Sequence, residues 1–190
     1  GSSALAQGGV AAALDGGDSP GRHAADTMVA GAGLCHPEVV EMVTAEGPRR
    51  VAELLALGAR LDTDGAGRLT LGREAAHSRH RIVHAAGDAT GAELVRALNE
   101  AVHLRGGVEV IADELALDLL EGGGRVVGVR TRNRGGQVCD RLATAVVLAT
   151  GGVGQLWART TNPVDVTGGG LAMAARAGAL LAGLEMVQFH

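Results

Sequence analysis

The sequence lacks a surplus of positive charge. Its 190 residues include 17 Lys and Arg against 21 Asp and Glu, for a formal net charge of −4. A protein that binds DNA or RNA needs basic residues to neutralise the phosphate backbone. We therefore expect no nucleic-acid partner.

Long apolar runs and paired cysteines are missing too. The longest uncharged apolar stretches, such as 143–152 and 177–184, fall well short of the roughly 20 residues that span a membrane. The chain does not begin with a basic segment followed by an apolar run. Cys35 and Cys139 are far apart in the sequence and suit a reducing compartment. We expect a cytoplasmic protein with no membrane segment.

Aromatic residues are nearly absent, with one Trp, one Phe and no Tyr, whereas glycine is abundant, with 31 residues. An average protein contains about 7% glycine. Because 46% of the residues are hydrophobic and the glycines separate apolar, periodic segments, close backbone approach explains them better than disorder. They fit either tight turns or a backbone that lies against a ligand. The length suits one domain or part of one.

The first half of the chain shows mainly helical signals. Ser19 before Pro20 predicts the start of a helix that reaches about Val29 and ends in a GAG turn. Apolar residues at helical spacing from 37 to 55 predict two more helices, because Gly47-Pro48 interrupts them. Further expectations are a short hairpin within 61–71, an unperiodic polar segment at 72–87, and a helix from Thr90 to Gly106 with Leu94, Val95, Leu98 and Val102 on one face.

The second half shows strand signals. Four short β-type runs predict one strand followed by a three-stranded antiparallel meander, at 108–112, 115–120, 125–131 and 137–143. The run AVVLATGG at 145–152 is continuously apolar, like a buried strand of a parallel sheet whose end meets a ligand. Helices, meander and buried strand together predict an α/β domain.

The ATGG sequence at the end of that run has two interpretations. Glycine there lets the backbone approach a cofactor, but an ordinary strand-to-loop turn has the same composition. A dinucleotide-binding fold also requires a G-x-G-x-x-G after a leading strand, and the sequence contains none. Either the fold is different, or its first βα unit is not in this chain.

A polar, histidine-rich cluster occupies residues 71–91. His77, His80 and His84 could bind zinc from one face of a helix, but the neighbouring arginines would repel a cation. Arginine and protonated histidine suit the two carboxylates of a dicarboxylate better. A solvated charged loop explains the same composition. We expect no metal site. His190, which follows an apolar segment, fits a structural role as well as a functional one.

Six stretches of the sequence, taken in order, are more specific than any single motif. They resemble the L-aspartate oxidase family, within the superfamily of fumarate reductase and succinate dehydrogenase flavoproteins. The matching stretches are SSALAQGG (2–9), the segment 26–35, REAAHSRHRIVHAAGDATG (73–91), VVLATGGVGQLW (146–157), TTNP with GGGLAMAARAGA (160–179) and LEMVQFH (184–190). Their order and spacing are similar to those of the family along almost the whole chain.

The resemblance implies a Rossmann-like FAD-binding domain with an antiparallel meander and without its first βα unit. Residues 1–190 would be a partial FAD-binding domain that ends where a capping domain starts. The phosphate-binding unit and the arginine that transfers protons in this family would lie outside the chain. We therefore expect the isolated chain to bind little or no FAD and to be inactive.

The resemblance also assigns site residues. Those expected to contact FAD are Ser2, Ser3, Ala6, Gln7, Gly8, Gly9, Ala116, Thr150, Gly151 and Gly169. Glu74 would meet the ammonium group of the substrate, and His190 one of its carboxylates. Membrane-bound relatives carry a histidine joined covalently to FAD at the place of Ser2, so FAD should be held non-covalently here. Gly169 stands where the family usually has an Asp that helps to hold the flavin.

The implied reaction is the FAD-dependent oxidation of L-aspartate, a dicarboxylic amino acid, to iminoaspartate, with FAD reoxidised by oxygen or fumarate. The product would enter quinolinate and NAD biosynthesis through quinolinate synthase. Two alternatives stay open: a soluble flavoprotein of the fumarate reductase or succinate dehydrogenase type, and a non-catalytic FAD-binding module. Glu74 favours the amino acid, because an unsubstituted dicarboxylate has no ammonium group for it to meet.

Overall fold

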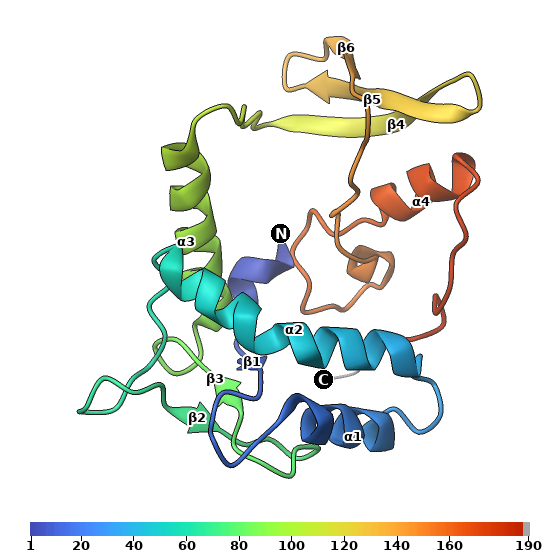
Figure 1. Ribbon diagram of the computed structural model, residues 1–190. Coiled ribbons are helices and arrows are strands. Elements are labelled where there is room, and N and C mark those ends of the chain that lie inside the picture. Colours follow the sequence, from blue (N-terminus) through green and yellow to red (C-terminus); the bar gives the residue numbers. More distant parts are fainter. Residues whose placement is uncertain (188–190) are drawn as a thin grey trace. The chain divides into compact units, whose positions relative to one another are not determined.

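The computed structural model describes residues 1–187, and the chain divides into two compact units (Figure 1). The helical unit comprises residues 3–108. The meander unit comprises residues 1–2 and the chain from Glu109 onward. Among the described helices, none is long and apolar enough to cross a membrane.

Helix α1 (Pro20–Ala30) begins where the sequence predicts. Ser19 is its N-cap, and the Ser19 Oγ accepts a hydrogen bond of 3.2 Å from the Arg22 amide. Pro20 suits the first helical position, where a backbone N–H would have no partner within the helix. The helix ends at Gly31, so the predicted GAG turn is confirmed.

Helix α2 (Pro37–Ala56) is continuous, so the predicted break at Gly47-Pro48 is wrong. A proline inside a helix removes one backbone hydrogen bond and costs about 3 kcal/mol. Burial outweighs this cost, because one side of the helix is packed both before and after the proline. The buried residues are Val40, Thr44 and Val51. Helices α1 and α2 lie side by side (Figure 1).

Three two-residue strands form an antiparallel sheet in the helical unit: β1 (Val10–Ala11), β2 (Leu71–Gly72) and β3 (Ile82–Val83). Strand β3 is in the middle, with Val83 opposite both Val10 and Leu71. The polar segment 72–87 therefore contains a strand that no sequence pattern marks, because two residues are too few to show a period. The hairpin predicted within 61–71 is present only as a single bridge between Thr63 and Leu69.

Helix α3 (Thr90–Arg105) is confirmed. Its buried residues are Thr90, Gly91 and Ala97, whereas Leu98, on the face expected to be apolar, is 43% exposed. The core of the helical unit lies instead where the small sheet meets α2. Its members are Ala12, Val51, Leu61, Val83 and Ala85.

The meander predicted in the second half is confirmed. Strands β4 (Glu114–Gly122), β5 (Arg125–Asn133) and β6 (Val138–Leu142) pair in the order β4-β5-β6 and lie side by side in Figure 1. A 3-10 helix η2 (Gly154–Leu156) and helix α4 (Gly169–Arg176) follow. The Arg176 guanidinium donates to the Asp118 carboxylate at 3.1 Å and thus ties α4 to β4.

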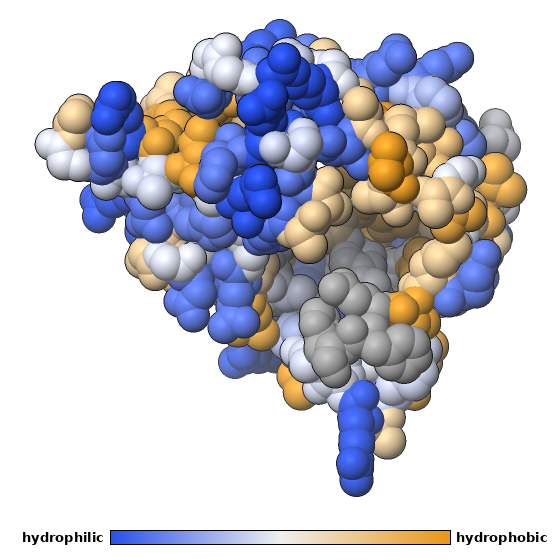
Figure 2. All heavy atoms as spheres, turned by 90° about the horizontal axis from the view of Figure 1, so that it is seen from below, coloured by the Kyte–Doolittle hydropathy of each residue, from blue (hydrophilic) through white to orange (hydrophobic). Residues whose placement is uncertain are grey.

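Two predicted strands, 108–112 and 145–152, are irregular in the structure. A strand is stable when a neighbouring strand completes its backbone hydrogen bonds, and no described strand pairs with either segment. Their apolar side chains stay at the surface, with Val110 60% exposed and Val147 87% exposed. Figure 2 shows apolar residues at the surface of one face, next to hydrophilic ones.

Candidate functional site

The loop at 3–9 is held at both ends by glycines. The Gly91 amide at the start of α3 donates to the Ala6 carbonyl at 2.9 Å. A Cβ at Gly91 would lie 1.9 Å from the Ser3 carbonyl oxygen, so only glycine allows this contact. At the other end of the loop, a Cβ at Gly9 would lie 2.4 Å from the Val83 carbonyl oxygen. The predicted cofactor loop is therefore fixed to α3 and β3.

Between these anchors the loop is open. Apart from its chain neighbours, no described residue has a heavy atom within 4 Å of where the Cβ of Gly8 would be, and residues 2–8 are exposed. Packing among residues 1–187 thus does not explain a glycine at this position. An open glycine backbone is what a flat, extended cofactor needs in order to lie directly on the main chain. Ser3, Ala6 and Gln7 lie on the same exposed segment, and Ser2 begins the 3-10 helix η1 (Ser2–Leu5).

The second predicted cofactor segment lies in the meander unit, at the turn after residue 149. A Cβ at Gly170 would lie 1.8 Å from the Thr150 Oγ1, so the start of α4 is packed directly on Thr150. Gly151 has a φ of +72° and, like Gly152, has open space where its Cβ would be. Gly169 is the first residue of α4 and is exposed. The open backbone at Gly151 and the exposed position of Gly169 are compatible with the predicted contact with FAD.

Ala116 lies in β4, opposite Thr131 of β5, directly before an irregularity in the strand register. It is half-buried, and its backbone belongs to the meander. Its predicted contact with the adenosine end of FAD stays a prediction. The predicted carboxylate-binding residue His190 lies outside the described residues.

Glu74 is exposed on the loop between β2 and β3. Its carbonyl oxygen accepts a hydrogen bond of 3.0 Å from the His77 amide, which forms a tight turn. The strand register shows that β1 and β2 run parallel on either side of β3, so Gly9 precedes one end of the sheet and Glu74 follows the other end. The structure therefore places the cofactor loop and the Glu74 loop on the same sheet but at opposite ends.

The histidines of the 71–91 cluster do not converge. The His77 Nδ1 lies 3.2 Å from an Arg81 nitrogen, and the His80 Nδ1 lies 3.2 Å from the Leu71 carbonyl oxygen. The His84 ring lies against the backbone of Gly72. Within the part of the chain that the structure describes, no group of three or more His, Cys, Asp or Glu side chains could hold a metal ion. The zinc alternative therefore has no support.

Arg81 is the buried charge of the helical unit, and no sequence signal separates it from the other basic residues around it. Its side chain is fully buried, and its guanidinium donates to Asp18 through two nitrogens, at 2.7 and 2.9 Å. A third nitrogen donates to Asp26 at 2.6 Å. Hydrogen bonding from Arg81 lowers the pKa of Asp18, and hydrogen bonds from Ser78 and Arg81 lower the pKa of Asp26. The cluster is charged at neutral pH.

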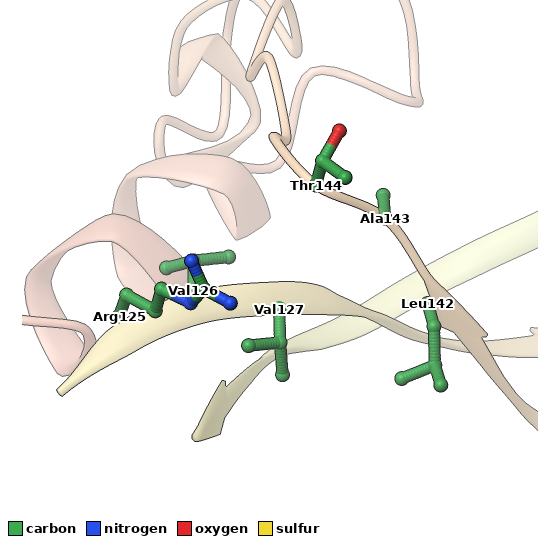
Figure 3. Close-up of a pocket in the computed structure, with 6 residues that line it drawn as sticks. All are labelled: Arg125, Val126, Val127, Leu142, Ala143 and Thr144. Carbon is green, nitrogen blue, oxygen red and sulfur yellow. The ribbon is translucent and has the colours of Figure 1, made fainter. Parts of the chain in front are cut away.

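A pocket of about 470 Å³ lies at the edge of the meander (Figure 3). The residues that line it are Arg125, Val126, Val127, Leu142, Ala143 and Thr144. None of the predicted site residues is among them. The side chains are mainly aliphatic, and no pair of acid and base groups is present, so this pocket carries no catalytic assignment.

Comparison with known proteins identifies the class to which this fold and site belong. The FAD binding domain family matches residues 1–190, and the chain belongs to that family. The predicted α/β FAD-binding fold and the predicted cofactor, FAD, are thereby confirmed.

The similar proteins define the resemblance more closely. The chain is 52% identical to an L-aspartate oxidase of Streptomyces coelicolor, over 100% of this chain and 33% of that protein. It is also 52% identical to an L-aspartate oxidase of Caulobacter vibrioides, over 100% of this chain and 37% of that protein. The predicted resemblance to this family is confirmed. The chain spans about a third of the length of these relatives.

Solved structures of the same superfamily share the fold. A Mycobacterium smegmatis Sdh1 structure in complex with UQ1 matches 92% of this chain and 32% of its own, with a TM-score of 0.87 and 32% identity. A quinol-fumarate reductase with menaquinol molecules matches 93% of this chain and 31% of its own, with a TM-score of 0.89 and 30% identity.

Proposed function

We propose that this chain forms part of the FAD-binding domain of an L-aspartate oxidase, an enzyme that oxidises L-aspartate to iminoaspartate with FAD bound non-covalently. The observation that carries the proposal is the difference in identity. The chain is 52% identical to L-aspartate oxidases along its whole length, against 30–32% for the two dicarboxylate flavoproteins of the same fold.

The chain's own residues would position cofactor and substrate. Bound FAD supplies the acceptor for a hydride from the substrate carbon. The open backbone at Gly8 and Gly151 would lie along the cofactor, and a serine at position 2 cannot form the histidine bond of the membrane-bound relatives. Glu74 would hold the substrate ammonium group, and His190 one carboxylate. Such orientation would bring the reacting carbon to the cofactor, which is one way in which the protein would accelerate the reaction.

The remaining parts of the proposal concern the complete enzyme. Residues 1–190 would be a partial FAD-binding domain, and the proton-transfer arginine and the capping domain would belong to other parts of the protein. The enzyme would act in the cytoplasm, and its product would pass to quinolinate synthase. The isolated chain would bind little FAD.

The test uses the full-length protein purified with FAD. We expect turnover of L-aspartate and no oxidation of succinate. Glu74→Gln should raise the KM for L-aspartate by about 10- to 100-fold, because one charge-assisted hydrogen bond to the ammonium group is worth about 1.5–3 kcal/mol. The matched control is Glu41→Gln, which changes an exposed glutamate on α2. Oxidation of succinate but not of L-aspartate would refute the proposal.

The second candidate is a dicarboxylate flavoenzyme, which the TM-score of 0.89 to a quinol-fumarate reductase favours on fold alone. Reduction of fumarate without any oxidation of L-aspartate would establish it. A non-catalytic FAD-binding module is the third, supported by Gly169 where the family usually has an Asp. In that case Gly169→Asp should tighten FAD binding, and neither substrate should be turned over.

A further inference from the structure

The loop that carries Glu74 is closed by an ionic cluster of the buried Arg81 with Asp18 and Asp26, joined by the exposed Ser78, which we call the Arg81 cluster. We propose that the Arg81 cluster is a positioning device for Glu74, and that it sets the preference for an amino acid over an unsubstituted dicarboxylate. The proposal rests on the function proposed above, because it gives Glu74 the role of meeting the substrate ammonium group.

Asp26 of α1 holds the loop at two points. Its Oδ2 accepts hydrogen bonds of 2.8 Å from both the amide and the hydroxyl of Ser78. The same oxygen accepts from the Arg81 guanidinium at 2.6 Å. One carboxylate oxygen therefore connects α1 to a residue inside the loop and to the residue that closes it.

The backbone of Arg81 forms the stem of the loop. Its amide donates to the Gly72 carbonyl at 2.9 Å, and its carbonyl accepts from the Ala12 amide at 3.0 Å. The His77 amide donates to the Glu74 carbonyl, and the His77 Nδ1 lies 3.2 Å from an Arg81 guanidinium nitrogen. A short chain of contacts thus runs from the buried guanidinium to the backbone of Glu74.

The loop has little packing of its own apart from the His77 ring, whose centroid lies 5.6 Å from that of the His23 ring. Residues 73–76 and 78–80 are exposed, so the loop gains little stability from burial of its own side chains. Hydrogen bonds to the Arg81 cluster fix its path, together with the contact of the His80 ring with the Leu71 carbonyl and that of the His77 ring with His23. A buried ion pair is often no more stabilising than an apolar packing of the same volume, so conformational specificity is a reason to keep one.

The position of Glu74 matters because recognition of an ammonium group depends on distance. A misplacement of about 1 Å in a positioned group can reduce a rate by about a hundredfold. Succinate has no ammonium group, so its binding should not respond to a shift of Glu74. The useful ratio is kcat/KM for L-aspartate divided by the affinity for succinate. A shift of Glu74 should lower this ratio, whereas general damage to the site should weaken both quantities together.

The experiment uses the full-length protein loaded with FAD, with kcat/KM for L-aspartate and the inhibition constant for succinate as readouts. The main variant is Asp26→Asn, which keeps the size and an acceptor oxygen for Ser78 but removes the charge toward Arg81. The control is Asp140→Asn, which removes an exposed aspartate that also accepts from an arginine, at 2.7 Å. Glu74→Gln and the double variant Asp26→Asn/Glu74→Gln complete a double-mutant cycle, which measures the coupling between the two residues.

We expect Asp26→Asn to lower kcat/KM for L-aspartate by about tenfold and to leave the succinate constant within about twofold. In the Glu74→Gln background it should have no further effect on the ratio. Asp140→Asn should match the wild type. Ser78→Ala, which loses only the hydroxyl bond to Asp26, should give a smaller loss in the same direction and serves if Asp26→Asn does not fold.

An equal loss for both ligands, or the same loss in the Glu74→Gln background, would show a merely structural role and overturn the inference. An unchanged ratio in both Asp26→Asn and Ser78→Ala, with a lowered ratio in Glu74→Gln, would overturn it while leaving the proposed function intact. An unchanged ratio in Glu74→Gln would instead remove the proposed role of Glu74, and the positioning role with it.

Discussion

The two units of the chain are stabilised by different interactions. The helical unit buries most of the apolar core of the described residues and also the ion pair of Arg81 with Asp18. The meander unit buries few apolar side chains, chiefly Val166 and Met173. Its segments are held by strand pairing and by close glycine contacts such as Gly170 on Thr150.

This difference indicates that the stability of the helical unit depends on its own side-chain packing more than that of the meander unit does. Exposed side chains such as Val147, 87% exposed, and Leu180, 96% exposed, contribute almost no hydrophobic stabilisation to the meander unit. Contiguous exposed apolar surface also favours aggregation. We expect side-chain truncations to be costly in the helical unit and mild in the meander unit, apart from its close backbone contacts.

The largest expected effect comes from the buried arginine. Arg81→Met should destabilise the protein by about 3–5 kcal/mol, because it leaves the carboxylates of Asp18 and Asp26 without their cation. Arg130→Met is the matched control, since Arg130 also bonds one aspartate through two nitrogens, at 2.7 and 2.8 Å, but is 48% exposed. It should cost less than about 1 kcal/mol. Urea denaturation followed by circular dichroism measures both, and equal losses would contradict the comparison.

The next effect tests the close contact in the meander unit. Gly170→Ala should cost up to about 3 kcal/mol, because the new methyl group would lie 1.8 Å from the Thr150 Oγ1. Gly152→Ala should be tolerated, since none of the residues that the structure describes, apart from its chain neighbours, has an atom within 4 Å of the new methyl group. Thermal unfolding of the two variants checks the difference. Similar melting temperatures would mean that α4 is not held by this contact.

A pair of identical truncations measures the contrast in burial. Val51→Ala removes two methyl groups from a side chain that is 2% exposed and should cost about 2 kcal/mol. Val147→Ala removes the same groups from a side chain that is 87% exposed and should change stability by less than about 0.5 kcal/mol. Urea denaturation can measure both, and a costly Val147→Ala would show that this segment is packed in solution.

The smallest effect concerns pH. Burial lowers the pKa of His23, which lies beside the Arg81 cluster on α1. As the pH falls below about 6.5, the unfolded chain takes up a proton that the folded His23 resists, so stability should decrease with falling pH. His23→Asn should flatten this decrease between pH 7 and 5. Denaturation midpoints across that range give the slope, and a slope as steep as in the parent protein would exclude His23 as its source.

Local signals predicted α1, α3 and the three strands of the meander, but not α4 or the two-residue strands of the helical unit. The Ser19-Pro20 start of α1 and the turns of the meander depend on interactions between residues close in sequence, and they are confirmed. The predicted break at Gly47-Pro48 was wrong because burial of side chains along α2 outweighed the cost of a proline inside the helix. The predicted strand at 145–152 was wrong because a long-range interaction is missing among the described residues. An apolar run forms a strand only when a neighbouring strand pairs with its backbone, and the spacing of residues within the run does not show whether such a strand is present.

In the candidate site, too, residues in short motifs were predicted and long-range contacts were not. The resemblance to a family assigned Glu74, Ser2 and the glycines, because short motifs keep their order along the chain. The sequence included Arg81 in the polar cluster 71–91, but its buried ion pairs were not predicted, since its partners Asp18 and Asp26 are 63 and 55 residues away and no pattern connects them. Contacts of this length arise only when the sheet and α1 are assembled.

The glycine anchors of the 3–9 loop have a consequence for how a cofactor is received. A free loop of this length would lose about 1–2 kcal/mol of backbone entropy per residue when a ligand ordered it. Here the contacts at Gly9 and Gly91 order the loop when the protein folds, so this entropy is lost before any ligand binds. The loop is therefore preorganised, and ligand binding is not weakened by the need to order it. Changes at Gly9 or Gly91 should therefore weaken folding itself, whereas a change at Gly8 should act only when a ligand is present.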